Sequence, residues 1–279
     1  MPVINTNVNS IVAQNATNKS DRAMTKTMEK LATGYRINKS GDDAAGLAVS
    51  TKLTAQIRGT NQAARNVSDA IALVQTADGA AKEISAIMQR MRELAVQGST
   101  ETYSTADLAL MDLEYQQLES EITRIVAQTK WNKMELLDGS GGSGGAGAFI
   151  IQVGSDNAQS VTVSIGNLDI AAGSLGCLSG LDVSTQSNAS SAITNIDGAF
   201  QTLSTIRADY GSYMNRLEST LNNAEVFSAN MSEANSRLYD TDYAKEMTEF
   251  AKSQIVRQAG MAMLSQANAI PNQVLQLLQ

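Results

Sequence analysis

The stretch QAGMAMLSQANAIPNQVLQLLQ, residues 258–279, contains no Asp, Glu, Lys or Arg, and neither does MPVINTNVNSIVAQNATN, residues 1–18. Chain ends that face water usually carry charge, because charge keeps them solvated. These two ends instead mix Val, Ile, Leu and Met with Asn, Gln, Ser and Ala. That composition suits burial, with side-chain amides hydrogen-bonded inside a protein interior. Both ends are therefore predicted to be buried against other protein, and the chain is predicted to assemble.

Between the two ends, apolar residues recur every three or four positions, which is the spacing of one face of a helix. The pattern predicts helices over 5–33 and 43–97, followed by a third helix that begins at a Ser104–Asp107 capping box. Further along the chain it predicts a fourth helix over 187–238 and a last helix from Asp242 to the end. Two alternating runs, 149–153 and 161–165, predict a β-hairpin. The fold class is therefore mainly α: long antiparallel helices in a coiled-coil-like bundle, one small β-hairpin, and paired N- and C-termini.

The order of these elements is close to a palindrome and suggests two domains. Residues 1–41 and 240–279 would form a terminal helical pair, and residues 42–239 a helical bundle with its hairpin near 149–165. The glycine run at 139–147 is either a flexible linker or loop, or an engineered joint. A two-helix pair is thin, and burial against neighbouring copies would stabilise it. The predicted polymerisation interface consists of Ile4, Val8, Ile11, Val256, Met263, Ile270, Val274 and Leu277.

Composition argues against catalysis and against several classes of partner. The chain has no His and a single cysteine, Cys177, which removes the commonest general base and any thiolate metal site. The adjacent Asp42 and Asp43 are interpreted as helix-capping carboxylates and not as an acid–base pair. We therefore predict no catalytic, cofactor-binding or metal-binding residues. A net charge of −7 makes a nucleic-acid partner improbable, and no apolar run is long enough for membrane insertion.

Three blocks of sequence resemble bacterial flagellins. The stretch LATGYRINKSGDDAAGLA at 31–48 resembles the family's N-terminal signature, and QRMRELAVQ at 89–97 resembles its helix-end motif. The stretch from Asp242 through Gln254-Ile255, followed by Gln258-Ala-Gly, Gln266-Ala-Asn and Val274-Leu275, is similar to the family's C-terminus. Together with the predicted hairpin, the resemblance spans nearly the whole chain.

The resemblance implies a structural subunit, not an enzyme, that polymerises into the helical flagellar filament used for swimming. Such subunits are secreted unfolded through the flagellar type III apparatus to the extracellular flagellum. A cap protein and a hook–filament junction protein are implied partners, as is an export chaperone that holds the C-terminal helix. The terminal segments would be disordered in the monomer and form the inner tube, with residues 42–239 in the outer tube. Only residues 166–186 separate hairpin and returning helix, so this is a short form that lacks the outer variable domains.

The resemblance also implies a site for innate immune recognition by a host Toll-like receptor at Gln89, Arg90, Leu94 and Glu114.

Three alternatives to a filament subunit remain open. A hook–filament junction protein shares such terminal helices but assembles as a short zone, and the density of flagellin-type signatures in 31–48 and 242–275 argues against it. A soluble coiled-coil adaptor that binds a partner helix would have stable helical ends in the isolated monomer. An enzyme is the weakest alternative.

Overall fold

The structure, a computed structural model, describes residues 6–142, 145, 147–171 and 173–276, with side chains as far as Ile270. It divides into two compact units, one of Met1–Ala55 with Asn230–Gln279 and one of Gln56–Ala229. Two long helices, α2 (Ala44–Gly98) and α4 (Gln186–Tyr239), contribute residues to both units. The predicted boundaries at 41/42 and 239/240 follow the helix ends instead, and they remain a prediction about the assembled protein.

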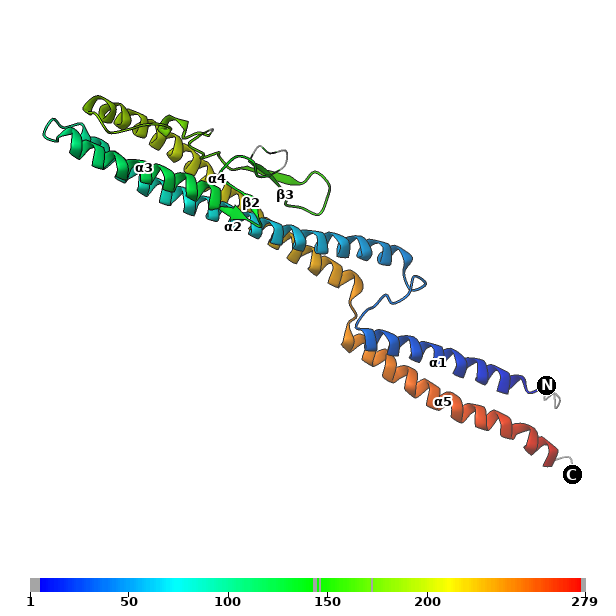
Figure 1. The fold of residues 1–279 in the computed structure, drawn as a ribbon. Coiled ribbons are helices and arrows are strands. Elements are labelled where there is room, and N and C mark those ends of the chain that lie inside the picture. Colours follow the sequence, from blue (N-terminus) through cyan, green and yellow to red (C-terminus); the bar gives the residue numbers. More distant parts are fainter. Residues whose placement is uncertain (1–5, 143–144, 146, 172, 277–279) are drawn as a thin grey trace. The chain divides into compact units, whose positions relative to one another are not determined.

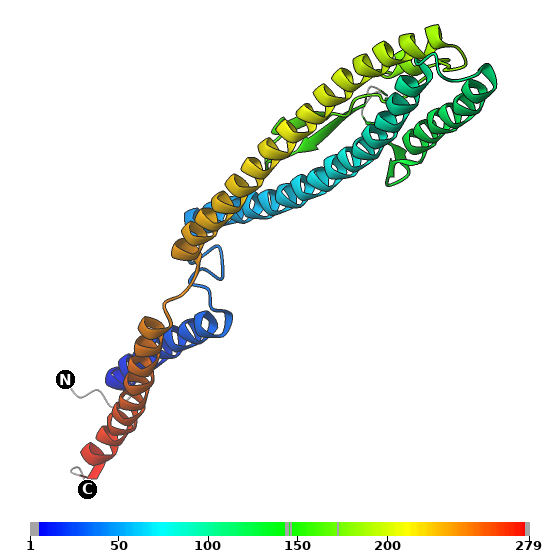
Figure 2. The same ribbon diagram turned by 90° about the vertical axis from the view of Figure 1, so that its left-hand side faces the viewer.

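The first unit is built on the first and last helices, α1 (Val8–Thr33) and α5 (Tyr243–Gln276), which run antiparallel and side by side (Figures 1 and 2). Helix α1 ends where expected, because Gly34 adopts the left-handed conformation (φ 76°) and its N–H donates to the Lys30 carbonyl at 2.9 Å. Helix α5 begins at the predicted cap, since the Asp242 carboxylate accepts from the Ala244 and Lys245 N–H groups at 3.0 and 3.2 Å. The predicted pairing of the chain's two ends is confirmed.

The second unit contains most of α2 and α4 together with α3 (Thr105–Gln128), three helices that lie along one another in Figures 1 and 2. The predicted capping box is present at the start of α3, between Ser104 and Asp107. On α3, Tyr115 and Ile122, seven residues apart, are fully buried. Their neighbours in the core are Ala, Leu, Ile, Val and Met side chains from α2 and α4, as expected of a chain poor in aromatic residues.

Ion pairs that remain in contact with water join α2 and α4 at the edge of this core. Arg92 Nε lies 2.7 Å from Asp197 Oδ1 and links α2 to α4, and Arg207 Nε lies 2.8 Å from Asp78 Oδ1 and links the same two helices. Charge pairs in contact with water contribute little to stability, because water already solvates both partners. The apolar core is therefore the main source of stability in this unit.

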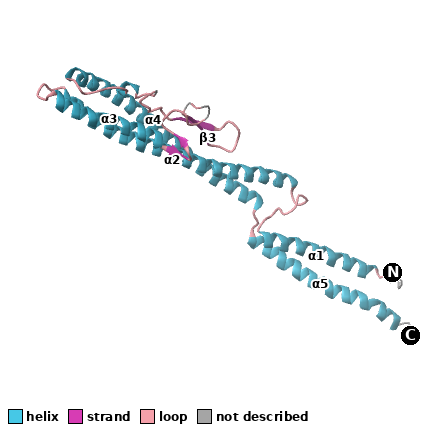
Figure 3. Ribbon diagram, in the orientation of Figure 1, coloured by secondary structure: helices cyan, strands magenta, loops and turns pink. Residues whose placement is uncertain are grey.

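The predicted hairpin forms between β3 (Ala148–Gln152) and β4 (Ser160–Ser164), shown as strands in Figure 3. Phe149 pairs with Val163, and both side chains are buried in the core of the second unit. A second, shorter hairpin joins β1 (Lys130–Trp131) to β2 (Met134–Glu135) and was not predicted. Its turn residues, Asn132 and Lys133, both have positive φ, which suits a two-residue hairpin turn.

The glycine run at 139–147 forms the loop between β2 and β3. Its described residues are tied to the surrounding structure: the Gly147 N–H donates to the Gly141 carbonyl at 2.9 Å, and the Gly147 carbonyl accepts from the Ile165 N–H at 2.8 Å. The following connection, between β4 and α4, is irregular apart from one 3-10 turn at Gly176–Leu178, as expected. Two carboxylates of α3 hold it, because Asp112 and Glu119 accept from the N–H groups of Val183 and Gly180.

Candidate assembly interface

The most deeply buried residues of helices α1 and α5 have small side chains. The buried residues of α1 are Thr17, Ser20 and Thr27, and on α5 Ala267 is buried and Gly260 half-buried. At Gly260 an added Cβ would lie 2.8 Å from Thr17 Oγ1. Small residues of this kind let two helix backbones approach closely, but they remove little apolar surface from water. The intrachain pairing therefore gains limited hydrophobic stabilisation.

Polar contacts set the register of the pair. Asn7 Nδ2 donates to the Ala267 carbonyl at 2.8 Å, and Ser20 Oγ donates to the Ser253 carbonyl at 3.0 Å. Near the opposite end of the pair, Lys30 Nζ lies 2.7 Å from Glu246 Oε1, and both side chains are largely shielded from water. These contacts connect residue numbers whose sums are nearly constant, which is the signature of an antiparallel pair in a single register.

Many large apolar side chains of α1 and α5 face outward in the single chain, whereas Met24, Leu31, Phe250 and Leu264 are half-buried. On α5, Val256, Met263 and Ile270 are exposed and recur every seven residues, so they lie on one face of the helix. Met263 is 65% exposed. Other exposed apolar residues of the two helices are Val8, Ile11, Val12, Met28, Met247, Ile255 and Met261. Soluble monomers rarely expose so much apolar side-chain surface, and such surfaces mark contacts with another protein or a membrane.

Five of the eight residues predicted for polymerisation are among these exposed positions: Val8, Ile11, Val256, Met263 and Ile270. Ile4 and Leu277 lie outside the described residues, as does the side chain of Val274. The apolar pattern read along α5 splits between two environments, because Gly260 and Ala267 pack on α1 while Val256, Met263 and Ile270 stay free. Sequence reasoning missed the buried Thr and Ser residues of α1, although Thr17, Ser20 and Thr27 follow the three- and seven-residue spacing of a helix seam.

A folded connector joins α1 to α2. The carboxylate of Asp42 holds it from two sides: Oδ2 accepts from the Asn38 and Lys39 N–H groups at 3.2 Å each, and Oδ1 lies 2.7 Å from Lys26 Nζ on α1. The hydrogen bond from Lys26, together with the two backbone N–H donors, lowers the pKa of the Asp42 carboxyl from its ordinary value. The neighbouring Asp43 accepts from the Gly46 N–H at 2.8 Å at the start of α2. The two carboxylates thus have separate structural roles and do not form an acid–base pair.

The residues of the predicted receptor site lie on α2 and α3 of the second unit. Gln89, Arg90 and Glu114 are exposed, and Arg90 Nη2 lies 2.9 Å from Glu114 Oε1. Leu94 differs from the other three because it is only 2% exposed and belongs to the apolar core. The structure therefore brings three of the four side chains to an accessible surface and places the fourth beneath it.

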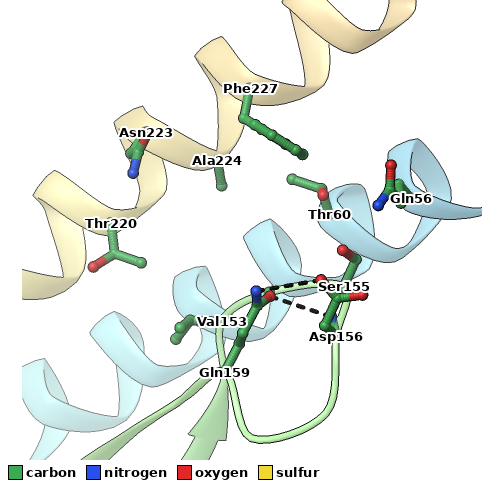
Figure 4. A pocket seen from close by; sticks show the side chains of 11 residues that line it. Gln56, Thr60, Val153, Ser155, Asp156, Gln159, Thr220, Asn223, Ala224 and Phe227 are labelled. Atoms are coloured by element: carbon green, nitrogen blue, oxygen red, sulfur yellow. Dashed lines mark hydrogen bonds between the residues drawn. The ribbon is translucent and has the colours of Figure 1, made fainter. Parts of the chain in front are cut away.

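The described part of the chain contains no group of three or more His, Cys, Asp or Glu side chains that could hold a metal ion. Within the same described residues, every helix is too short or too polar to cross a membrane. A pocket of about 320 Å³ lies between α2, α4 and the turn of the β3–β4 hairpin (Figure 4). Asp156, Gln159 and Thr60 contribute to its lining, and Asp156 and Gln159 hydrogen-bond to each other. The lining offers no paired nucleophile and base.

These features define a long-helix structural protein. Residues 4–141 match the bacterial flagellin N-terminal helical region, and residues 193–278 match the bacterial flagellin C-terminal helical region. A flagellin of Halalkalibacterium halodurans is 46% identical over 254 residues, which cover 91% of each chain. Flagellin FlaB1 of Treponema pallidum is 37% identical over 287 residues, covering 99% of this chain and all of that protein. The crystal structure of Bacillus cereus flagellin superposes with a TM-score of 0.50 and 32% identity, over 57% of this chain and 88% of that one.

The chain belongs to the bacterial flagellin family. It is a structural protein that self-assembles into the extracellular flagellar filament, and family membership confirms that it is not an enzyme. The matched relatives are covered over nearly their full length, as expected for a short form of the family.

The close approach at Gly260 gives a first prediction. Gly260→Ala places a methyl group against Thr17 Oγ1, and such overpacking costs about 1–3 kcal/mol. We expect slower elongation on filament seeds and a lower filament melting temperature, although alanine is the better helix former. Thr17→Ala in the same chain should restore both. The control is Gly211→Ala in α4, where an added Cβ meets nothing within 4 Å. Equal behaviour of the 260 and 211 variants would contradict the close-approach argument.

The Asp42 contacts give a second prediction, on pH dependence. Because folding lowers the pKa of this carboxyl, its stabilisation is complete above the unfolded value of 3.8 and is lost as pH falls through the folded value. Asp42→Asn should lower the filament melting temperature at pH 7, and the difference from the unmodified protein should shrink toward pH 3. Asp209→Asn, at an exposed position on α4, is the control and should show no such pH-dependent difference. A gap for Asp42→Asn that stays constant with pH would refute the assignment.

Proposed function

We propose that the outward apolar faces of α1 and α5 are the surfaces through which neighbouring subunits contact one another in the filament. The observation that carries this proposal is the exposed line of Val256, Met263 and Ile270 on a helix segment that has no charged residue after Arg257. Burying one side chain of this size contributes roughly 1.5–3 kcal/mol, so a few such residues on each subunit supply substantial association energy. Water solvates a charged surface favourably, whereas the exposed apolar face of α5 is stabilised by removal from water.

The terminal pair would form the inner tube of the filament, and residues 42–239 the outer tube. Each subunit would contact others through unlike surfaces, and such heterologous contacts grow an open helical fibre when they do not close into a ring. The small, polar seam between α1 and α5 supports the further proposal that these ends are disordered in the free monomer. Their ordering would then be coupled to addition at the growing tip, where intersubunit burial offsets the entropy cost.

The same exposed face would serve the subunit before assembly. We propose export of the unfolded chain through the flagellar type III apparatus, with a chaperone covering the C-terminal helix. The apolar residues of α5 are the kind of surface that a helix-binding chaperone shields from premature contacts. Assembly at the tip would take place under the cap protein, above subunits of the hook–filament junction. The family resemblance suggests these partners, and the exposed face of α5 supports the proposed chaperone contact.

A Toll-like receptor remains a proposed partner at Gln89, Arg90 and Glu114. The Arg90–Glu114 pair bridges α2 and α3 and presents one fixed arrangement of charge on an accessible surface. Leu94 would act from beneath, by packing α2 against the core, because its side chain is not accessible to a partner. The large exposed side chains Val96 and Tyr103 lie near this site in the sequence and offer apolar area to a binding partner.

The outward face gives a third prediction. Val256→Asn combined with Ile270→Asn replaces two exposed apolar side chains by polar ones of similar size. The single chain should keep its central bundle, because neither residue contacts the core of the second unit. Seeded elongation should fall by at least about tenfold, since burial of two apolar groups is lost. Val256→Ile, which keeps the surface apolar, is the matched control. Normal elongation of the doubly substituted chain would rule out this interface.

Proteolysis separates the filament subunit from the coiled-coil adaptor and gives a fourth prediction. In the free monomer, trypsin should remove the segments up to Arg36 and from Lys245 well before it cuts within 56–229. After assembly on seeds the same sites should resist. Sites in the exposed part of the second unit, such as Lys133, report whether protease activity is equal in the two samples. Resistant ends in the monomer would favour the adaptor.

A further inference from the structure

Four methionines of α1 and α5 are unusually accessible. Met28, Met247, Met261 and Met263 are 50–65% exposed in the single chain, whereas Met88 and Met91 in the core of the second unit are fully buried. Because Lys30 pairs with Glu246, Met28 and Met247 lie at the same level of the antiparallel pair. Met263 belongs to the line of residues that recur every seven positions. All four are therefore parts of the surface that the proposed function buries in the filament.

Exposed methionine is chemically vulnerable in a way that the other apolar residues of this surface are not. Hydrogen peroxide transfers one oxygen atom to the thioether sulfur: an S=O bond forms, the O–O bond breaks, the sulfur is oxidised and the peroxide is reduced to water. The product is a polar sulfoxide, which disrupts methionine-rich interfaces and is reversed by methionine sulfoxide reductases. Leu, Ile and Val do not undergo this reaction, so a surface containing four exposed methionines has a reversible chemical sensitivity.

We propose that Met28, Met247, Met261 and Met263 form an oxidation-sensitive site that determines whether a free subunit can join the filament. This inference rests on the proposed function of the outward faces. In a free subunit the four thioethers meet peroxide directly, and in the filament neighbouring subunits shelter them. A sulfoxide oxygen buried at the interface needs a hydrogen-bond donor. The segment around Met261 and Met263 has no Lys or Arg after Arg257, so charged donors from this segment are absent.

Peroxide treatment of free subunits, followed by addition to seeds, tests the proposal. Peptide mass spectrometry should find sulfoxide early at Met28, Met247, Met261 and Met263 and last at Met88 and Met91; Met134, also exposed, lies outside the proposed surface. Seeded elongation should fall by about tenfold or more, because an unpartnered polar group is costly to bury. Incubation of the oxidised subunits with methionine sulfoxide reductases and a thiol reductant should restore elongation. A variant with all four methionines changed to Leu keeps apolar volume and should elongate normally after the same treatment.

The outcomes separate the inference from the proposed function. Preformed filaments treated in parallel should keep the four methionines reduced. If they are oxidised in filaments as quickly as in free subunits, the proposed interface itself fails. If filaments protect them but oxidised subunits still elongate at the normal rate, only the inference is overturned. It is also overturned if the four-Leu variant loses elongation after peroxide, which would assign the effect to another residue such as Cys177. Should that variant not assemble at all, reductase repair of the unsubstituted protein decides: unrepaired loss of elongation refutes the inference.

Discussion

The pairing of α1 with α5 depends on how closely two helix backbones can approach. At Gly260 there is no room for a Cβ, because Thr17 Oγ1 would lie 2.8 Å away. A seam with so little room selects Thr, Ser, Gly and Ala, and these residues bury little apolar area. Several larger apolar residues of α5, such as Val256 and Met263, lie on the outside, where this chain does not cover them.

The second unit is stabilised in the opposite way. Its three helices and two hairpins enclose Tyr115, Tyr210 and Met91, all fully buried, and its ion pairs lie at the edge in contact with water. Burial of tyrosine raises the pKa of both phenols, because the charged form is poorly solvated in the core. Such a unit has its own apolar core and does not need a neighbour for stability.

The sequence predicted the helix bounds to within about three residues, because long helices that bury one face carry a persistent three- and four-residue spacing. It predicted the β3–β4 hairpin because an alternation of apolar and polar residues is visible in the sequence over about five positions. The β1–β2 hairpin was missed because two-residue strands have no period to detect. For the interface, the spacing identified Val256, Met263 and Ile270 but did not distinguish them from Gly260 and Ala267. Spacing records that a face is apolar, and only the structure shows whether the chain covers that face itself. The burial of Leu94 was missed because a family motif carries no information on depth.

The connector between α1 and α2 is a short, mostly polar stretch that is held in place by a few specific contacts. Ile37 is buried, and Gly46 on α2 approaches it so closely that an added Cβ would lie 2.8 Å from Ile37 Cδ1. The N–H groups of Asn38 and Lys39 donate to the carboxylate of Asp42, which also pairs with Lys26 on α1. The backbone of the connector is thus held in part by a contact with α1, the helix that pairs with α5. The Lys39–Glu29 ion pair is a second contact between the connector and α1, so the order of the connector depends on the folding of that helix.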